Sequence, residues 1–547
     1  MARLFVIEAP GKARTFQEIL RTVGEEAKVQ ATVGHIFQFP DRLDPVGIDS
    51  TFREFERKPK DLAKVERLRQ EAMIADEVIV ATDADQEGDA IAWDVATVIR
   101  DMHPNPRRMR LRGMDAVSVK EALDNLTDVR KEDAVPARTR AIVDRLIGAG
   151  FSGGGVAVGR VGTALLGLVA NTKPGVLKMR LVAPAKDGGR PYVAECPVEG
   201  ELDEKTAKRL TEIDFPALGQ QGVKPAGYRP GNMGDVMVRA GDQLDMSPKE
   251  TSSAMQRLYE AGRLSYPRAG SRGFSPTIAL KVAEVLRKAG YNSKGERFDV
   301  KSEDSVHDAP YPIGKVDLHN DPSQLGQDEG VRATIARDLV RASSGQTHEN
   351  AITAPIPPFL VSKGFSPKIA DKVAALGWTR ELGPSYPGKE SWPESEIVRR
   401  RPDTVVLERA VEAGLGRPST WANHIENFMS RDLVNENLAL TERGQHWVDS
   451  SPKELLDPRI SAAIEQACER FSPAMMQDAE REPWELNAER ICRALPAAIK
   501  SVVERQVASE PARPKLDPIS AYGLDQTFVA DAEATARRPG YAPPSQR

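Results

Sequence analysis

Two short apolar runs, each followed by acidic residues, constrain this chain more than any other feature. Residues 4–7 and residues 78–81 are continuous apolar runs of the length that buried strands have. Helical stretches follow them, from about Thr15 and from Gly88. Strands that alternate with helices are typical of an α/β domain built on a parallel sheet. Residues 1–128 are therefore predicted to form such a domain.

Acidic side chains follow both predicted strands. Glu8 ends the first run, and Asp83, Asp85 and Glu87 follow the second. Alternate residues of an extended chain share a face, so Asp83 and Asp85 can point the same way with Glu87 close behind. Crowded carboxylates favour a hard cation such as Mg²⁺, and the carboxyl ends of strands are where open α/β sheets bind ligands. An isolated D-x-D is more often a helix-capping loop, but four acids after two strands favour a metal site.

The overall composition leaves the function open. With 547 residues, of which 40% are hydrophobic and 29% charged, the chain is typical of a soluble protein with several domains. No apolar run approaches the roughly 18–20 residues that span a bilayer. An early glutamate interrupts the N-terminal apolar stretch, so no signal peptide and a cytoplasmic location are expected. A net charge of −4 does not by itself indicate nucleic acid, so any such site must be a local concentration of Arg and Lys.

Two glycine motifs do not support a nucleotide cofactor. Residues 148–153 match G-x-G-x-x-G, but a helical stretch precedes them where a dinucleotide site needs a strand. Gly11-Lys12 lacks the upstream glycine and the downstream Ser or Thr of a P-loop. We therefore expect neither NAD nor ATP to be bound.

The clearest local prediction is a helix that begins after Ser247. Serine as N-cap, proline at the first helical position and glutamate at the third form a capping box. The apolar face of this helix is Ala254, Met255, Leu258 and Ala261. Gly262 is a natural C-terminal stop, after which the chain runs into residues 264–268.

Several short blocks, taken in order, resemble the type IA DNA topoisomerases. Glu8-Ala9-Pro10-Gly11-Lys12 with Asp83-x-Asp85-x-Glu87-Gly88 is similar to the Toprim domain of that family. Four further blocks are similar to S-x-G-H-I, G-R-V-Q-[ST], I-[ST]-Y-x-R-T-D-S and G-I-G-R-P-S-T-Y-A, at residues 33–36, 159–163, 263–268 and 414–422. The blocks span residues 4–444 in the order of the family.

The resemblance implies that one DNA strand is cut and resealed by a tyrosine. Tyr266 would be the nucleophile, forming a phosphotyrosine bond to the 5′ end of the strand. Arg268 would stabilise the negative charge on the phosphate in transit. Glu8 would handle the proton of the leaving 3′-oxygen, and Lys12 would steady the phosphate. His307 matches the histidine of an H-x-A-I-x-P-T segment near the scissile phosphate.

The resemblance also implies the ligands. Mg²⁺ would be held by Glu8, Asp83, Asp85 and Glu87. The partner would be a single-stranded segment of underwound DNA, and no ATP would be needed because the bond energy is stored in the phosphotyrosine. A monomer associated with the nucleoid is expected.

A further set of residues matches positions that bind the single strand leading to the cut. They are His35, Arg140, Asp144, Arg160, Thr163, Arg417, Ser419 and Thr420. Phosphate contacts of this kind position a strand with little regard to its sequence. Taken alone, Arg140 and Asp144 are equally an ordinary ion pair four residues apart on a helix.

The implied fold class is an α/β and α multi-domain protein, in which a Toprim (Rossmann-like) domain, helical domains and a β-rich arch form a ring. The Toprim domain would be residues 1–128, and a helical domain carrying Tyr266 would be 241–345. Residues 129–185 with 400–505 would be the DNA-gripping domain, 186–240 with 346–399 the arch, and 506–547 a poorly ordered tail. Cys196, Cys468 and Cys492 are too dispersed for a zinc ribbon, which indicates a minimal member of the family.

Several positions depart from the family pattern. Gln86 and Asp89 replace the arginine and the last glutamate of D-x-D-R-E-G-E, and Gly162 replaces the glutamine of G-R-V-Q. Ala269-Gly270 replaces the Thr-Asp that usually follows the tyrosine block. These changes keep two alternatives open, a Toprim primase or nuclease and a DNA clamp without catalysis. The first has no reason to carry the tyrosine block, and the second has no reason to keep the acids.

Overall fold

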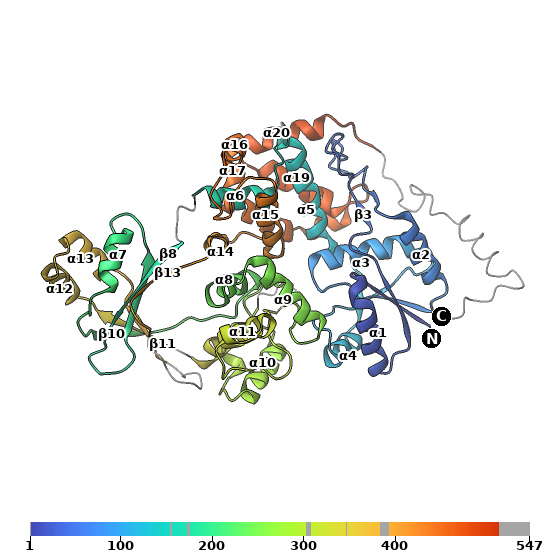
Figure 1. Ribbon diagram of the computed structural model, residues 1–547. Coiled ribbons are helices and arrows are strands. Elements are labelled where there is room, and N and C mark those ends of the chain that lie inside the picture. The colour runs from blue at the N-terminus through green and yellow to red at the C-terminus, as the bar shows by residue number, and fades with distance from the viewer. Residues whose placement is uncertain are drawn as a thin grey trace, which may run out of the picture. The chain divides into compact units, whose positions relative to one another are not determined.

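The computed structural model describes residues 2–153, 156–171, 176–301, 308–345, 347–382 and 393–513 (Figure 1). The described chain forms two compact units. The first contains the residues up to Arg160, Ser451–Leu455 and those from Ile460 onward, and the second contains Val161–Ser450 and Leu456–Arg459. Among the described residues, no helix is both long and apolar enough to cross a membrane.

The first unit is built on a five-stranded sheet with the order β2-β1-β5-β6-β7. The strands are β1 (Arg3–Ile7), β2 (Ala27–Ala31), β5 (Glu77–Val80), β6 (Arg107–Arg108) and β7 (Thr127–Asp128). All neighbours pair in parallel except β6 and β7. After their first residues, Arg3 and Glu77, the central strands β1 and β5 are apolar and buried because a parallel sheet is covered on both faces. The predicted α/β domain with its parallel sheet is confirmed.

Helices cover this sheet and continue into a helical part of the same unit. The helices beside the sheet are α1 (Ala13–Thr22), α2 (Leu62–Met73), α3 (Gln86–Ile99) and α4 (Ala116–Asp124). The helical part contains α5 (Lys131–Phe151), α18 (Pro458–Glu469), α19 (Pro483–Ala494) and α20 (Ala497–Ala508). Its core joins residues such as Ile142, Cys468 and Ile491, which lie far apart in sequence. Helix α20 extends into the predicted tail, whose residues from 514 onward lie outside the described residues.

The second unit contains a six-stranded sheet with the order β10-β11-β12-β9-β8-β13, in which every neighbouring pair is antiparallel. The strands are β8 (Leu177–Ala183), β9 (Tyr192–Pro197), β10 (Gly219–Pro225), β11 (Thr347–Ile352), β12 (Thr379–Leu382) and β13 (Glu396–Arg399). In Figure 1, α7 (Glu204–Thr211), α12 (Ile356–Ser362) and α13 (Pro367–Ala374) lie beside this sheet, and their apolar residues share its core.

Other helices of the second unit include α16 (Glu442–Ser450) and a group in which α11, α14 and α15 pack against α8 or α9. The bounds of these helices and of their neighbours are α6 (Arg160–Asn171), α8 (Met233–Leu244), α9 (Pro248–Glu260), α10 (Pro276–Lys288), α11 (Gln327–Ser344), α14 (Pro402–Glu412) and α15 (Pro418–Ser430). The capping box predicted for α9 is confirmed, since Ser247 Oγ accepts from Glu250 N at 3.2 Å and Glu250 accepts from Ser247 N at 2.8 Å. Gly262 has a φ of 67°, as the predicted stop requires. Ala261 was wrongly placed on the apolar face, because the helix ends at Glu260 and leaves it exposed.

Glu485, in the first turn of α19, is a buried carboxyl group whose titration should affect stability. It is 4% exposed and accepts from Glu482 N at 3.0 Å. Burial raises the pKa of Glu485 from 4.5 to about 7, outweighing that hydrogen bond. The native state therefore holds this proton more tightly than the unfolded chain does, so stability is lost as the pH rises from about 4.5 to about 7.

We expect Glu485→Gln to remove this loss, because glutamine keeps the capping hydrogen bond without the charge. Its melting temperature should exceed that of the wild type by a few degrees at about pH 8 and match it at about pH 4.5. Thermal melting followed by circular dichroism at both pH values measures the difference. A variant that melts no higher than the wild type at the alkaline pH would contradict the pKa assignment.

Candidate active site

The loop between β5 and α3 holds two of the predicted metal ligands in a tight turn. Asp83 follows β5, and Asp85 is the N-cap of α3, where its side chain accepts from Gly88 N at 2.7 Å. Only glycine fits at position 88, since a Cβ atom there would lie 2.0 Å from the carbonyl oxygen of Asp83. Helix capping therefore fixes the Asp85 carboxylate, as the simpler interpretation of a D-x-D sequence expects.

Arg108 of β6 contacts this loop through hydrogen bonds. It was not among the site residues predicted from the sequence. Its buried guanidinium donates to the carbonyl oxygens of Thr82 and Asp83 at 2.9 and 2.7 Å. It also donates to Asp89 Oδ1, in the first turn of α3, at 2.9 Å. Backbone carbonyls and a carboxylate thus satisfy a buried charge that would otherwise be costly. Nothing in the residues around Arg108 indicates which groups its side chain contacts, so the sequence alone could not place it in the site.

Lys12 lies against the predicted metal site. Its Nζ is 2.7 and 3.0 Å from the two carboxylate oxygens of Asp83, and both side chains are buried. Glu8 follows β1, the parallel neighbour of β5, so it lies at the same edge of the sheet. Within the described ranges, no group of three or more His, Cys, Asp or Glu side chains is arranged to hold a metal ion. The oxygen donors of Glu8, Asp83 and Asp85 suit Mg²⁺ in kind, while in this arrangement the Lys12 ammonium balances the charge of Asp83.

Glu87 is held by basic side chains from two other elements. His35 Nε2 is 2.9 Å from Glu87 Oε2, and Arg140 Nη1 donates to Glu87 Oε1 at 2.9 Å. Arg140 also contacts Glu465 of α18 at 2.6 Å and donates to Gln86 Oε1. The structure therefore brings together three predicted site residues, His35, Glu87 and Arg140, in one hydrogen-bonded network.

Arg160 continues the same network. It donates to Asp144 Oδ1 and to Glu465 Oε2, both at 2.7 Å, and to the carbonyl oxygen of Ser461 at 3.0 Å. Arg140 and Arg160 are 3% and 2% exposed, so carboxylates rather than solvent surround both guanidinium groups. The sequence suggested an ion pair between Arg140 and Asp144 as one possibility. In the described part of this unit, Asp144 pairs with Arg160, and Arg140 pairs with Glu87 and Glu465. Their part in DNA binding stays a prediction.

In the second unit, Tyr266 follows α9 in a short extended segment. Ser265 anchors that segment, since its N donates to Tyr311 O at 3.0 Å and its Oγ accepts from Tyr311 N at 2.9 Å. Tyr266 is 4% exposed, and its ring packs edge-on against Tyr259 with centroids 5.6 Å apart. Arg268 is exposed two residues later. His307 lies outside the described residues.

Three of the predicted strand-binding residues of the second unit, Arg417, Ser419 and Thr420, lie at the start of α15. Arg417 is the N-cap in a left-handed conformation with a φ of 63°, and its carbonyl oxygen accepts from both N and Oγ1 of Thr420 at 2.9 Å. Trp421 is buried and donates to the carbonyl oxygen of Gly416 at 3.2 Å, which anchors this turn. Arg417, Ser419 and Thr420 are half-buried, whereas Thr163 of α6 is buried.

Comparison with known proteins decides the family. Residues 3–112 match the Toprim domain family. DNA topoisomerase 1 from Aquifex aeolicus is 25% identical over 522 residues, which cover 86% of this chain and 92% of that protein. The chain belongs to the type IA DNA topoisomerases, a family of isomerases.

Two further relatives agree with this assignment. Reverse gyrase 2 from Aeropyrum pernix is 29% identical over 460 residues, which cover 74% of this chain and 36% of that protein. The structure of full-length topoisomerase I from Thermotoga maritima has the same fold, with a TM-score of 0.58 at 19% identity, covering 90% of this chain and 89% of that one. The multi-domain α/β and α fold class predicted from the sequence is confirmed.

Two departures of this topoisomerase from the family pattern have structural partners. Gln86 accepts a hydrogen bond from Arg140 and donates one from Nε2 to Glu469 at 2.9 Å, and an arginine has no acceptor for the first of these. Asp89 forms its buried ion pair with Arg108. The topoisomerase thus uses both positions to fix the start of α3 against neighbouring elements.

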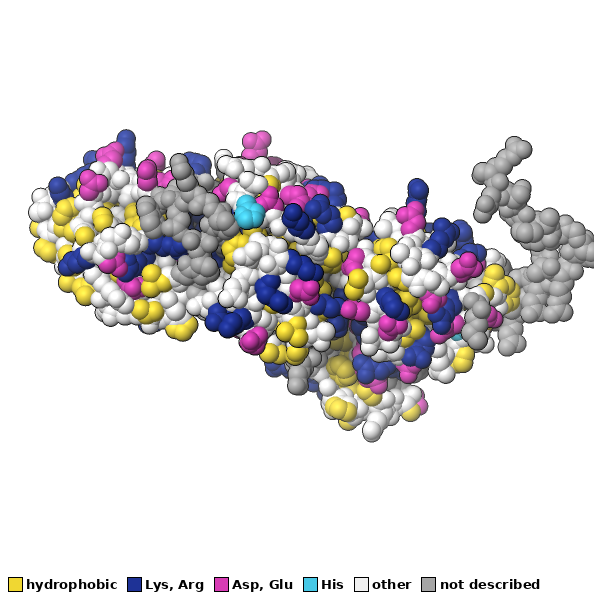
Figure 2. Space-filling view, turned by 90° about the horizontal axis from the view of Figure 1, so that it is seen from below, with side chains coloured by type: hydrophobic (Ala, Val, Ile, Leu, Met, Phe, Trp, Pro, Cys, Tyr) yellow, Lys and Arg dark blue, Asp and Glu magenta, His cyan; other side chains and the backbone are white. Residues whose placement is uncertain are grey.

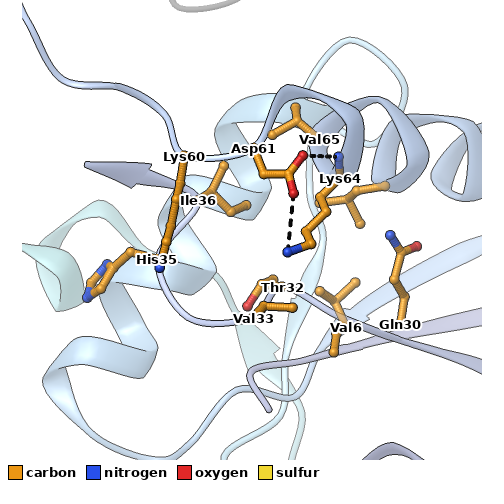
Figure 3. A pocket seen from close by; sticks show the side chains of 12 residues that line it. Val6, Gln30, Thr32, Val33, His35, Ile36, Lys60, Asp61, Lys64 and Val65 are labelled. Atoms are coloured by element: carbon orange, nitrogen blue, oxygen red, sulfur yellow. Dashed lines mark hydrogen bonds and ion pairs between the residues drawn. The ribbon is translucent and has the colours of Figure 1, made fainter. Parts of the chain in front are cut away.

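A small cavity of about 40 Å³ lies beside the loop that carries His35 (Figure 3). Its wall is largely apolar, and Lys64 beside it pairs with Asp61 at 3.2 Å. This volume holds about one or two water molecules, so the cavity is too small for a nucleotide.

On the face seen in Figure 2, basic and acidic side chains are interspersed, which agrees with the small net charge of the chain.

Proposed function

We propose that this chain relaxes negatively supercoiled DNA without ATP, by cutting one strand transiently through a 5′-phosphotyrosine at Tyr266. The observation that carries the proposal is the placement of Tyr266, anchored by Ser265 and Tyr311 and followed by the exposed Arg268, in a member of this family. After strand passage, the 3′-hydroxyl would attack the phosphotyrosine and reseal the strand, so that no nucleotide is consumed.

Each remaining residue has a proposed chemical role. A phenol has a pKa near 10, so attack by Tyr266 needs nearby positive charge, which Arg268 supplies while it also stabilises the phosphate. Glu8 would give a proton to the leaving 3′-oxygen, and Lys12 would contact the phosphate once released from Asp83. His307 is proposed to lie near that phosphate, by resemblance alone.

Mg²⁺ is the proposed cofactor. Glu8, Asp83 and Asp85, with Glu87 behind them, would hold it, and its charge would stabilise the phosphate and the leaving oxygen. Lys12 donates to both carboxylate oxygens of Asp83, one of the proposed ligands. Binding of the cation and release of Lys12 from Asp83 are therefore expected to occur together.

Single-stranded DNA is the proposed partner of a monomeric enzyme. The half-buried Arg417, Ser419 and Thr420 at the start of α15 support strand binding, as does the orientation of backbone N–H groups at a helix N-terminus. Arg140, Asp144 and Arg160, with His35 and Thr163, are proposed to take part. The two arginines would reach a phosphate only after Glu465 releases them.

Incubation with negatively supercoiled plasmid tests the proposal against both alternatives. With Mg²⁺ and without ATP we expect a ladder of relaxed topoisomers, which EDTA should abolish. A Toprim nuclease would instead leave permanently nicked or linear DNA, and a DNA clamp would leave the plasmid supercoiled. Either of those outcomes would overturn the proposed function.

A further inference from the structure

Gly162, in the first turn of α6, lies against the imidazole of His424 from α15. A Cβ atom at position 162 would be 3.0 Å from Nδ1 and 3.2 Å from Cε1 of that ring. These distances are shorter than ordinary van der Waals contact, so a side chain at 162 would have to displace the ring. Glycine inside a helix lowers its stability relative to alanine, and the space taken by His424 explains why glycine is present here.

His424 extends the row of residues that begins at the start of α15. Thr420 and His424 are four residues apart in α15, so they lie on one face of the helix, and the N-cap Arg417 directly precedes its first turn. His424 is half-buried, and its ring stacks on Phe428 with an interplanar angle of 24° and centroids 6.4 Å apart. Gly162 on one side and Phe428 on the other thus fix the orientation of the imidazole, with the Nδ1–Cε1 edge facing α6.

We propose that His424 is a further contact to the backbone of the single strand, one helical turn beyond Thr420. The proposal rests on the proposed function, because it takes the segment from Arg417 to Thr420 as the strand-binding surface. An imidazole N–H can donate to a phosphate oxygen, and a ring whose orientation is fixed loses little entropy on doing so. In this chain His424 supplies from α15 the polar group that the family pattern places at position 162 of α6.

Binding of single-stranded oligothymidylate tests the contact without cleavage. Fluorescence anisotropy in EDTA should show that His424→Ala weakens binding about five- to tenfold, as the loss of one phosphate hydrogen bond does. His424→Gln retains a donor and should bind within about threefold of the wild type. Asn423→Ala, which truncates an exposed neighbour on the same helix, is the matched control and should leave binding unchanged.

Moving the polar side chain from position 424 to position 162 tests whether the effect of His424→Ala comes from a lost polar contact or from altered packing. Gly162→Gln alone should lower both the melting temperature and the affinity, because the new side chain displaces His424. Combining Gly162→Gln with His424→Ala opens the space for glutamine and should recover most of the affinity that His424→Ala loses. Thermal melting of each variant shows whether it is folded.

The outcomes distinguish this inference from the proposed function. If the wild type binds the oligonucleotide and relaxes plasmid but His424→Ala binds equally well, the inference alone is overturned. Failure of both His424→Gln and the double variant to recover binding would also overturn it, since the loss would then come from packing. A wild type that neither binds the oligonucleotide nor relaxes plasmid would overturn the proposed function and this inference together.

Discussion

Tyr266→Phe should abolish formation of a covalent protein–DNA complex while leaving binding of single-stranded DNA unchanged. The substitution removes the one oxygen that can attack the phosphodiester, and phenylalanine has no nucleophilic atom to replace it. The ring of Tyr266 is 4% exposed and packs edge-on against Tyr259, and phenylalanine preserves that packing. Strand binding depends on phosphate contacts elsewhere, so affinity should stay within about twofold of the wild type.

Tyr259→Phe provides a matched control, because it removes a hydroxyl from the buried partner of the same ring pair. This variant should still form a complex with DNA that survives denaturant, as judged by gel electrophoresis of a labelled oligonucleotide. Plasmid relaxation should be lost only in Tyr266→Phe. A denaturant-stable complex in Tyr266→Phe would show that another residue is the nucleophile.

Local patterns in the sequence predicted those parts of the fold that local forces determine. The continuous apolar runs at residues 4–7 and 78–81 indicated β1 and β5 because parallel strands are buried on both faces. The serine, proline and glutamate at the start of α9 predicted its capping box, since that motif satisfies helix N–H groups within four residues. Both patterns depend on neighbours in the sequence and on no distant partner.

Contacts between distant segments could not be read from the sequence. The pairing of Arg108 with the loop after β5 depends on which strand lies beside β5, and no local pattern sets that order. Glu465 contacts Arg140 and Arg160 from more than 300 positions away, and no local pattern indicates that contact. For this reason the sequence did not show that Arg140 and Arg160, which are predicted to bind DNA, lie buried among carboxylates. The sequence therefore indicates which residues are candidates for the site but not the contacts that they make.

Lys12→Met should make the first unit strongly dependent on Mg²⁺ for its stability. Lys12 and Asp83 form a buried ion pair at 2.7 Å, with exposures of 4% and 6%. Removing one partner of such a pair leaves an uncompensated charge and typically costs about 3–5 kcal/mol. In EDTA the variant should therefore melt well below the wild type. If Asp83 is a metal ligand, Mg²⁺ restores a positive charge beside it and should raise the melting temperature of the variant far more than that of the wild type.

Two further variants make this test specific to the Asp83 site. Lys64→Met removes a half-exposed lysine whose partner is the surface residue Asp61, so it should cost less than about 1 kcal/mol and respond to Mg²⁺ as the wild type does. Lys12→Met combined with Asp83→Asn removes both charges and should lose the Mg²⁺ response while recovering stability in EDTA. Thermal melting with and without Mg²⁺ measures all four proteins independently of catalysis. An equal Mg²⁺ response in Lys12→Met and the wild type would remove Asp83 from the proposed metal site, because a ligand freed from its lysine must bind the cation more strongly.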